Sequence, residues 1–440
     1  MTDKDLCREL LKFIEQSPSC FHVVANLAEK FRNAGFCELK EQESWELQAG
    51  GKYYVTRNES SVIAFQIPQA VVKGFHMVAS HSDSPTFKIK EKAEKESEKQ
   101  YVVLNTEKYG GMILSTWMDR PLSVAGRVAV LNEDTAQSPN AYGIETRLVN
   151  IDKDLCVIPN LAIHMNRDIN KGVEYNPQVD MLPLLAGCNE TAGSQFADEV
   201  ARAAGVASED ILGQDLFLYV RDGGRMVGSN GEFILSPKLD DLQCVYASAK
   251  AFTAVAPKEY VSLCAVFDNE EVGSNTRQGA DSTFLEDVVE RICDCMPQEC
   301  VDGDRCHLQK RLVAGSFLIS ADNAHAVHPN HPEKADPTNR PYLNGGIVIK
   351  YHGSQKYTTD AVSGAKMKAY CKQAGVPWQT YTNRSDILGG STLGNISTAH
   401  VSVASVDIGL PQLAMHSAVE TAGSKDLAYA VKVFELFMAE

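Results

Sequence analysis

The sequence predicts an α/β protein in which a mainly parallel, mixed sheet is flanked by helices and interrupted by a β-rich insertion. Apolar strand-like segments alternate with helical ones up to residue 87 and again from residue 232. Such alternation is typical of parallel sheets that are covered on both faces. Between these segments β-like runs dominate. The length of 440 residues also favours two domains over one.

The first segment begins with helices. Residues 4–34 show helical periodicity with a break at SPS, and the second helix is expected to end at a glycine cap, Gly35. The run KYYVTRNESSVIAFQI, residues 52–67, alternates around a polar turn and predicts a hairpin. The apolar run GFHMVAS, residues 74–80, predicts a short strand that ends at His81.

The pattern of predicted elements changes in the middle of the chain, where strands outnumber helices. The charged stretch KIKEKAEKESEKQ, residues 88–100, is most simply a solvated loop or an edge strand. Strands are expected at 125–131, 147–151 and 215–220, and one helix is expected around 194–210.

The alternation of strands and helices returns near residue 233. Further elements are expected as a helix at 242–255, a strand at 261–267, a helix at 281–295, strands at 315–320, 346–351 and 401–406, and a helix at 424–438. The sequence thus predicts one domain made of residues 1–87 and 232–440, and a second domain inserted at 88–231.

Composition excludes several classes of protein. The hydrophobic content of 44% and charged content of 22% are those of an ordinary soluble globular protein, and no run has the length of a membrane span. A net charge of −15 argues against nucleic acids and anionic membranes as partners. The N-terminus has no apolar signal-peptide core, and the twelve cysteines are scattered. We therefore expect a cytoplasmic protein with free thiols.

Acidic or imidazole side chains follow five of the predicted strands. They are His81 and Asp83; Asp240 and Asp241; Asp268, Glu270 and Glu271; Asp322 and His325; and His416. Ligands of such sheets bind beyond the carboxyl ends of the strands, so these groups are expected at one rim. Each motif alone would more often be a helix cap, a solvated turn or a surface residue, but their joint occurrence indicates a site.

Carboxylates and imidazoles without matching lysines or arginines need a cation to offset their charge. Donors of nitrogen and oxygen without thiolate favour zinc, then manganese or cobalt. Two ions are the usual arrangement when one carboxylate bridges them. Asp83 could orient the ring of His81, and one of Glu270 and Glu271 could bind metal while the other takes a proton from water.

Six ordered motifs resemble the M18 aminopeptidases, the aspartyl aminopeptidase family. They are HSDSP (81–85), KLDDL (238–242), DNEEVGS (268–274), SADNAHAVHPN (320–330), GGSTLG (389–394) and PQLAMHS (411–417). The similarity runs from residue 17 to the final helix. It implies a zinc-exopeptidase domain that hydrolyses the first residue from peptides with a free N-terminus.

The resemblance also implies a role for each site residue. Two zinc ions would be held by His81 and Asp322 on one side, by Glu271 and His416 on the other, and by Asp240 as the bridge. Glu270 would be the general base and later the acid, and Asp83 would orient His81. A cis peptide bond is expected between Asp240 and Asp241, as in related two-zinc peptidases.

In this family the insertion is a dimerisation domain, and subunits assemble into a tetrahedral dodecamer. A histidine of the insertion reaches the neighbouring active site to help bind the scissile carbonyl. IPNLAIHMNRDIN, residues 158–170, is similar to that segment, so His164 is the candidate. The alternative is a histidine partly buried in a strand.

Lys350 corresponds to the lysine that pairs with an acidic first side chain in the family. The loop at 384–394 is expected to shape the substrate pocket, with Asp386, Gly389 and Gly390 as candidate binding residues. Many members have an arginine where this chain has Val419, which leaves a broad specificity for neutral residues as the alternative.

Two other functions are compatible with the residues alone. A carboxypeptidase or deacylase on the same scaffold could use Lys350 and Arg384 to bind a substrate carboxylate. A non-catalytic assembly protein would be free to lose metal ligands, and all five are present here.

Overall fold

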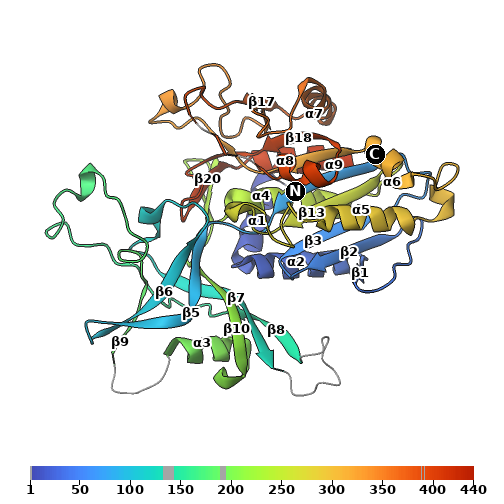
Figure 1. Cartoon of the computed structure of the whole chain (residues 1–440). Helices are drawn as coiled ribbons and strands as arrows, with labels where there is room; N and C mark the ends of the chain where they lie inside the picture. The colour runs from blue at the N-terminus through green and yellow to red at the C-terminus, as the bar shows by residue number, and fades with distance from the viewer. Residues whose placement is uncertain (1, 132–142, 189–194, 388, 391) are drawn as a thin grey trace.

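The structure is a computed structural model that describes residues 2–131, 143–188, 195–387, 389–390 and 392–440. Figure 1 shows two bodies, a larger one in which helices flank a sheet and a smaller one built mainly of strands. Both ends of the chain lie in the larger body (Figure 1). Of the helices in the described ranges, none combines the length and apolarity of a membrane span.

Two amphipathic helices open the chain, as predicted. Helix α1 (Asp3–Gln16) begins at a capping box formed by Thr2 and Asp5, and α2 (Cys20–Asn33) follows after three residues. The chain leaves α2 through Gly35, whose φ of 83° suits glycine better than other residues.

A nine-stranded mixed sheet forms the centre of the larger body, in the order β1-β2-β3-β13-β4-β14-β18-β16-β17. The strands are β1 (Cys37–Leu39), β2 (Lys52–Arg57), β3 (Ser61–Gln66), β4 (Phe75–His81), β13 (Val261–Phe267), β14 (Phe317–Ala321), β16 (Ile347–Lys350), β17 (Trp378–Tyr381) and β18 (Ala404–Gly409). Its central strands β13, β4, β14 and β18 are mutually parallel, so their carboxyl ends share one edge.

Helices cover both faces of this sheet. They are α4 (Leu239–Ala254), α5 (Phe284–Asp294), α6 (Leu308–Ala314), α7 (Ala361–Ala374), α8 (Leu393–His400) and α9 (Asp426–Met438). Neighbouring strand residues serve opposite faces, because side chains alternate along a strand. Val78 packs in the core with α4 and α9, whereas Met77 packs in the core with α5 and α6.

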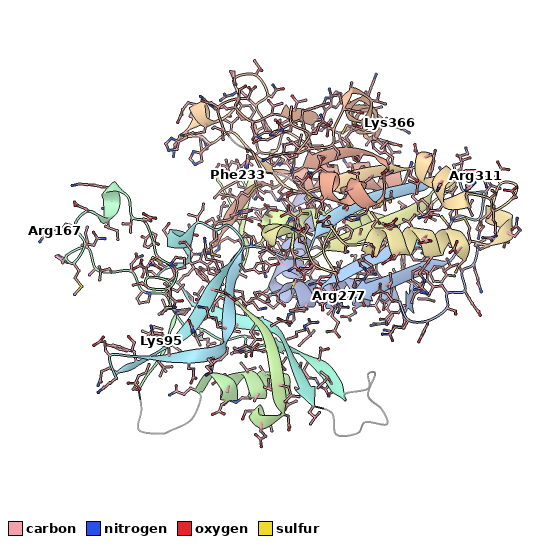
Figure 2. The ribbon with its side chains drawn as sticks, viewed as in Figure 1. Lys95, Arg167, Phe233, Arg277, Arg311 and Lys366 are labelled. Carbon is pink, nitrogen blue, oxygen red and sulfur yellow. The ribbon has the colours of Figure 1, made fainter. Side chains whose placement is uncertain are left out.

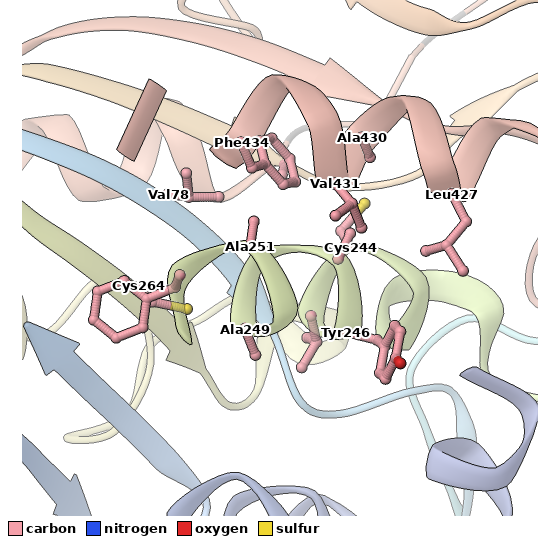
Figure 3. Close-up of a cluster of buried hydrophobic side chains, with 14 of the residues drawn as sticks. Val78, Cys244, Tyr246, Ala249, Ala251, Cys264, Leu427, Ala430, Val431 and Phe434 are labelled. Carbon is pink, nitrogen blue, oxygen red and sulfur yellow. The ribbon is translucent and has the colours of Figure 1, made fainter. Parts of the chain in front are cut away.

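Helices α4 and α9 pack closely against each other over the sheet. Figure 3 shows Val431 and Phe434 of α9 pointing toward Cys244 and Ala251 of α4. The small residues of α4 let the two backbones approach, and each large apolar side chain buried here contributes about 1.5–3 kcal/mol. This packing fixes the start of α4, which carries Asp240.

The smaller body is a six-stranded antiparallel sheet in the order β8-β7-β10-β5-β6-β9. The strands are β5 (Thr86–Ser97), β6 (Tyr101–Tyr109), β7 (Leu122–Leu131), β8 (Ile144–Asn150), β9 (Leu184–Gly187) and β10 (Ile211–Val220). Helix α3 (Gln195–Ala204) lies along this sheet (Figure 1). The division of the chain at residues 88 and 231 stays a prediction.

The prediction for residues 88–100 was wrong. Most of this stretch belongs to β5, which lies between β10 and β6 and is neither a loop nor an edge strand. Near the start of the strand, buried apolar residues alternate with charged ones: Phe87 and Ile89 are buried, while Lys88 forms an ion pair with Asp215 at 2.9 Å. The turn comes later, at Glu98 and Lys99, which have positive φ.

A third, five-stranded sheet lies beside the edge where the central strands end. Its order is β11-β12-β20-β19-β15, with β11 (Arg225–Val227), β12 (Phe233–Ser236), β15 (Ala324–His325), β19 (Pro411–Leu413) and β20 (Glu420–Gly423). The remaining elements are the 3-10 helices η1 (Leu114–Trp117), η2 (Ile169–Lys171), η3 (Ser208–Asp210), η4 (Glu270–Val272), η5 (Gln298–Cys300) and η6 (Pro332–Lys334). The turn between β19 and β20 carries His416.

Candidate metal centre

Five chain segments bring acidic or imidazole side chains to one edge of the nine-stranded sheet. They are His81 at the end of β4, Asp240 at the start of α4, Glu270 and Glu271 in η4, Asp322 after β14, and His416 between β19 and β20. The tight turn at η4 begins at Asn269, whose left-handed conformation (φ 63°) is one that asparagine tolerates well. It reverses the chain directly after β13 and leaves both glutamates on one turn.

Asp240 lies at the middle of this cluster. Its Oδ1 atom is 3.4 Å from Nε2 of His81, and the same ring nitrogen is 3.9 Å from Oδ1 of Asp322. Its Oδ2 atom is 3.6 Å from Nε2 of His416, which is 3.4 Å from Oε2 of Glu271. The two oxygens of one carboxylate thus face two different pairs of potential metal ligands.

Asp241 also belongs to the cluster, although no role was predicted for its side chain. The peptide bond between Asp240 and Asp241 is cis, as predicted. Oδ2 of Asp241 accepts a hydrogen bond from the backbone N–H of His81 at 3.3 Å. Potential ligand atoms of Asp241, His81 and Asp322 lie within 4.8 Å of one another.

Glu270 and Glu271 share a turn but have different surroundings. Glu271 faces His416, whereas Glu270 lines the neighbouring cavity. Burial above all, together with the carboxylates of Asp322 and Asp83, raises the pKa of Glu270 to about 8. A carboxyl group that titrates near neutral pH is suited to taking up a proton and returning it.

Asp83 connects β4 to the turn that carries the glutamates. Its Oδ1 atom lies 3.4 Å from Nδ1 of His81, and the backbone oxygen of Asp83 lies 3.1 Å from that nitrogen. Oδ1 also accepts from the backbone N–H of Glu270 at 3.2 Å, and Oδ2 accepts from that of Glu271 at 3.1 Å. One buried carboxylate therefore contacts three residues of the cluster.

The donors of the cluster fit zinc. Three buried carboxylate oxygens, Oδ1 of Asp240, Oδ1 of Asp241 and Oε1 of Glu271, have no hydrogen-bond partner among the described residues. Unpaired buried carboxylate oxygens are costly, and a cation in contact with them would offset that cost. The potential ligand groups in the described ranges contain carboxylates and imidazoles and no cysteine, a set that suits zinc.

A cavity of about 290 Å³ adjoins the cluster. Its wall beyond the cluster includes His325, Lys350, Tyr357, Tyr381, Gly390 and Met415. Lys350 is buried; its Nζ donates to the backbone oxygen of Asn323 at 2.9 Å and lies 3.5 Å from Oδ2 of Asp322. Burial opposes the charge, but the carboxylate of Asp322 and other nearby groups raise the pKa of Lys350, which stays protonated.

Of the other candidate substrate residues, Gly390 lines this cavity, whereas Gly389 and Asp386 are not among the described residues of its wall. The carbonyl of Gly389 accepts from Nζ of Lys356 at 3.0 Å. Asp386 forms an exposed ion pair with Arg384 at 2.7 Å. Its part in substrate binding stays a prediction. Residues 388 and 391 of the same loop lie outside the described residues.

Val419 packs against the core of the insertion and is not among the described residues of the cavity wall.

His164 lies in an exposed turn in which the N–H of Met165 donates to the oxygen of Ala162 at 2.8 Å. The alternative of a histidine partly buried in a strand is therefore wrong. Figure 2 shows the nearby Arg167 on an arm that projects from the insertion.

Glu420 is a residue of the site that the sequence analysis missed. It is 2% exposed; its Oε2 accepts from the backbone N–H of Asp240 at 3.0 Å, and its Oε1 accepts from that of His416 at 2.7 Å. Burial, followed by the charge of Asp240, raises the pKa of Glu420 to about 8. An acid four residues after a histidine was a visible signal, but its proximity to Asp240 depends on the third sheet.

A parallel sheet with carboxylates and imidazoles gathered at its carboxyl edge is the architecture of a metal-dependent hydrolase. The chain belongs to the M18 peptidase family, because the family model described as "Aminopeptidase I zinc metalloprotease (M18)" matches residues 13–438. The protein is accordingly a zinc-dependent aminopeptidase. Family membership thus favours this activity over the carboxypeptidase, deacylase and non-catalytic alternatives.

Several relatives match nearly the whole chain. The probable M18 family aminopeptidase 2 of Clostridium acetobutylicum is 47% identical over 437 residues, which cover 98% of each chain. The cryo-EM structure of the Ape4 and Nbr1 complex contains a chain with a TM-score of 0.92 and 35% identity, covering 99% of this chain and 86% of that one. The S. cerevisiae mApe1 dodecamer gives a TM-score of 0.83 at 27% identity, with coverage of 98% and 96%.

Replacement of Glu420 by glutamine is expected to weaken zinc binding by about 10–100-fold, the usual cost of losing a partner of metal ligands. The amide offers one acceptor oxygen, so the backbone N–H of Asp240 or of His416 loses its partner. Competition with a chromogenic chelator measures the effect, with Glu290→Gln on the exposed face of α5 as the control. A Glu420→Gln protein that binds zinc as tightly as the wild type would contradict a role of Glu420 in holding the metal ligands.

Proposed function

We propose that the protein is a two-zinc aminopeptidase that removes the first residue, preferably Asp or Glu, from peptides with a free N-terminus. The observation that carries the two-metal arrangement is the position of Asp240, whose oxygens face His81 and Asp322 on one side and Glu271 and His416 on the other.

In this proposal His81 and Asp322 would hold one zinc ion and Glu271 and His416 would hold the other, while Asp240 would offer one oxygen to each; manganese or cobalt could substitute. Zinc, when bound, supplies Lewis-acid activation of water and of the peptide carbonyl. Asp83 holds the ring of His81 and the turn of the two glutamates, so it orients the ligands. Carboxylates at the same rim would also attract the positively charged N-terminus of a peptide.

Glu270 transfers a proton from the attacking water to the leaving amine. Its carboxylate accepts a proton from the attacking water, and the carboxylic acid then donates that proton to the nitrogen of the leaving amine. The position of Glu270 beside both the cluster and the cavity supports this role. The backbone N–H of Glu270 donates to Oδ1 of Asp83, and this bond holds the turn that carries the glutamate.

Glu270→Gln is expected to retain zinc and to lose at least about 1,000-fold in kcat, because the amide cannot accept the proton. Zinc content by elemental analysis and initial rates on an aminoacyl anilide measure the two properties. Glu290→Gln provides a control of the same chemistry on an exposed surface. A Glu270→Gln enzyme with normal kcat would contradict the assignment.

Lys350 supports a preference for acidic first residues. Two partners, Asn323 and Asp322, account for two of the three N–H groups of its ammonium, which leaves one for a substrate carboxylate. The aromatic wall formed by Tyr357 and Tyr381 favours the second candidate, a broad specificity that includes neutral residues.

Lys350→Met is expected to lower kcat/KM on Asp and Glu anilides at least about tenfold more than on Leu and Ala anilides. Loss of Lys350 could also disturb Asp322 and so lower the rates on all substrates. The ratio of acidic to neutral rates within one variant is not affected by such a general loss. Lys372→Met, on the exposed face of α7, is the matched control. An unchanged ratio of acidic to neutral rates would exclude Lys350 as the selector and favour the broad specificity.

We further propose a homododecamer built from dimers, in which His164 helps to bind the scissile carbonyl in a neighbouring subunit. Leu161, Ile163 and Met165 beside it are 51–75% exposed, as expected of a surface that a partner covers. The dodecamer of S. cerevisiae mApe1 supports the assembly by analogy. The composition supports a cytoplasmic location, with neither nucleic acid nor membrane as a partner.

His164→Ala is expected to keep its assembled size in light scattering and to lose at least about tenfold in kcat. Co-assembly of His164→Ala with Glu270→Gln subunits should restore part of the activity, because some centres then combine an intact Glu270 with an intact His164. Activity of mixed assemblies no greater than the sum of the separate variants would contradict a contribution between subunits.

A further inference from the structure

The segment from Tyr109, the last residue of β6, to Thr116 in η1 runs from the insertion along the candidate metal centre of the same subunit. It contacts the centre at three places, which are the carboxylate of Asp83, the turn of Glu271 and the turn of His416. The first two contacts involve one residue each, and the third involves two.

The first contact is made by Tyr109, the last residue of β6. Its hydroxyl donates to Oδ2 of Asp83 at 2.7 Å, and the same oxygen accepts from the N–H of Glu271. Nδ2 of Asn269 donates to the tyrosine hydroxyl at 2.8 Å, so this oxygen is also tied to the turn of the glutamates. The ring packs edge-on against Phe217 of the insertion, with 5.5 Å between centroids.

The hydroxyl of Tyr109 is well suited to act as a donor. Burial, followed by the charges of Asp83 and Asp268, raises the pKa of Tyr109, so the hydroxyl keeps its proton at neutral pH. Asp83 accepts hydrogen bonds from two backbone N–H groups of the turn, and the tyrosine adds a third donor from another part of the chain.

The second contact is made by Gly110, whose φ is 79°. A Cβ atom at this position would lie 3.1 Å from Cβ of Glu271 and 3.2 Å from its backbone oxygen. The absence of a side chain therefore lets the backbone of the insertion approach a candidate metal ligand closely.

The third contact holds the turn of His416. The N–H of Ile113 donates to the backbone oxygen of His416 at 3.0 Å. Three residues further on, Oγ1 of Thr116 accepts from the N–H of Ala418 at 2.9 Å. The segment is thus hydrogen-bonded on both sides to the turn that carries this imidazole.

We propose that the Tyr109–Thr116 segment of the insertion positions the metal ligands of its own subunit, with Tyr109 and Gly110 as the positioning residues. This inference rests on the proposed metal centre. It gives the insertion a role within one subunit that is separate from any role in assembly.

Tyr109→Phe tests the hydroxyl while it keeps the ring. We expect zinc affinity, measured by chelator competition on the assembled protein, to fall by about 10–100-fold, and kcat to fall at saturating zinc. Tyr219→Phe is the matched control, because that hydroxyl donates to Asn150 within the insertion. Wild-type zinc affinity and wild-type kcat in Tyr109→Phe would overturn the inference.

Gly110→Ala tests the close approach to Glu271, and Gly205→Ala is its control. Both glycines have positive φ, 79° and 71°, but a Cβ at Gly205 would meet nothing within 4 Å. We expect weakened zinc binding in Gly110→Ala alone, and equal zinc binding in the two variants would overturn the role of the contact. Wild-type protein that binds no zinc would instead contradict the proposed function itself.

Discussion

The mutual repulsion of carboxylates at one edge of the central sheet is the constraint on which the rest of the structure depends. Asp240, Asp241, Glu270, Glu271 and Asp322 meet there, and several of their buried oxygens lack a partner among the described residues. Burial without compensation would be costly for each of them. In the proposed two-zinc centre, a divalent cation on either side of Asp240 would offset this cost and would supply the chemistry of a zinc aminopeptidase.

Three different parts of the fold hold this cluster together. The parallel strands supply His81 and the glutamate turn, and Asp83 ties them to each other. The third sheet contributes Glu420, which links the backbone at Asp240 to that at His416. The insertion adds its Tyr109–Thr116 segment. His81, Asp240, Glu271 and His416 are thus restrained by contacts with residues that are not ligands themselves, which is the organisation that precise metal geometry requires.

Much of this could be predicted from the sequence, because strand and helix periodicity is local. The strand 261–267 and the cluster of acids at strand ends are examples, as is the long hairpin at 52–67. Glu420 and Tyr109 could not be assigned, since their contacts join segments more than 25 residues apart and depend on the third sheet and the insertion. The interior position of β5 in its sheet was not predicted, because most of the stretch is charged and only Phe87 and Ile89 near its start are buried.

The central claim is that Asp240 bridges two metal ions. Crystals of zinc-loaded protein, measured above and below the zinc absorption edge, test it most directly. The account predicts two anomalous peaks about 3.5–4 Å apart, one beside each oxygen of Asp240. One peak at most, or peaks that do not contact Asp240, would contradict it.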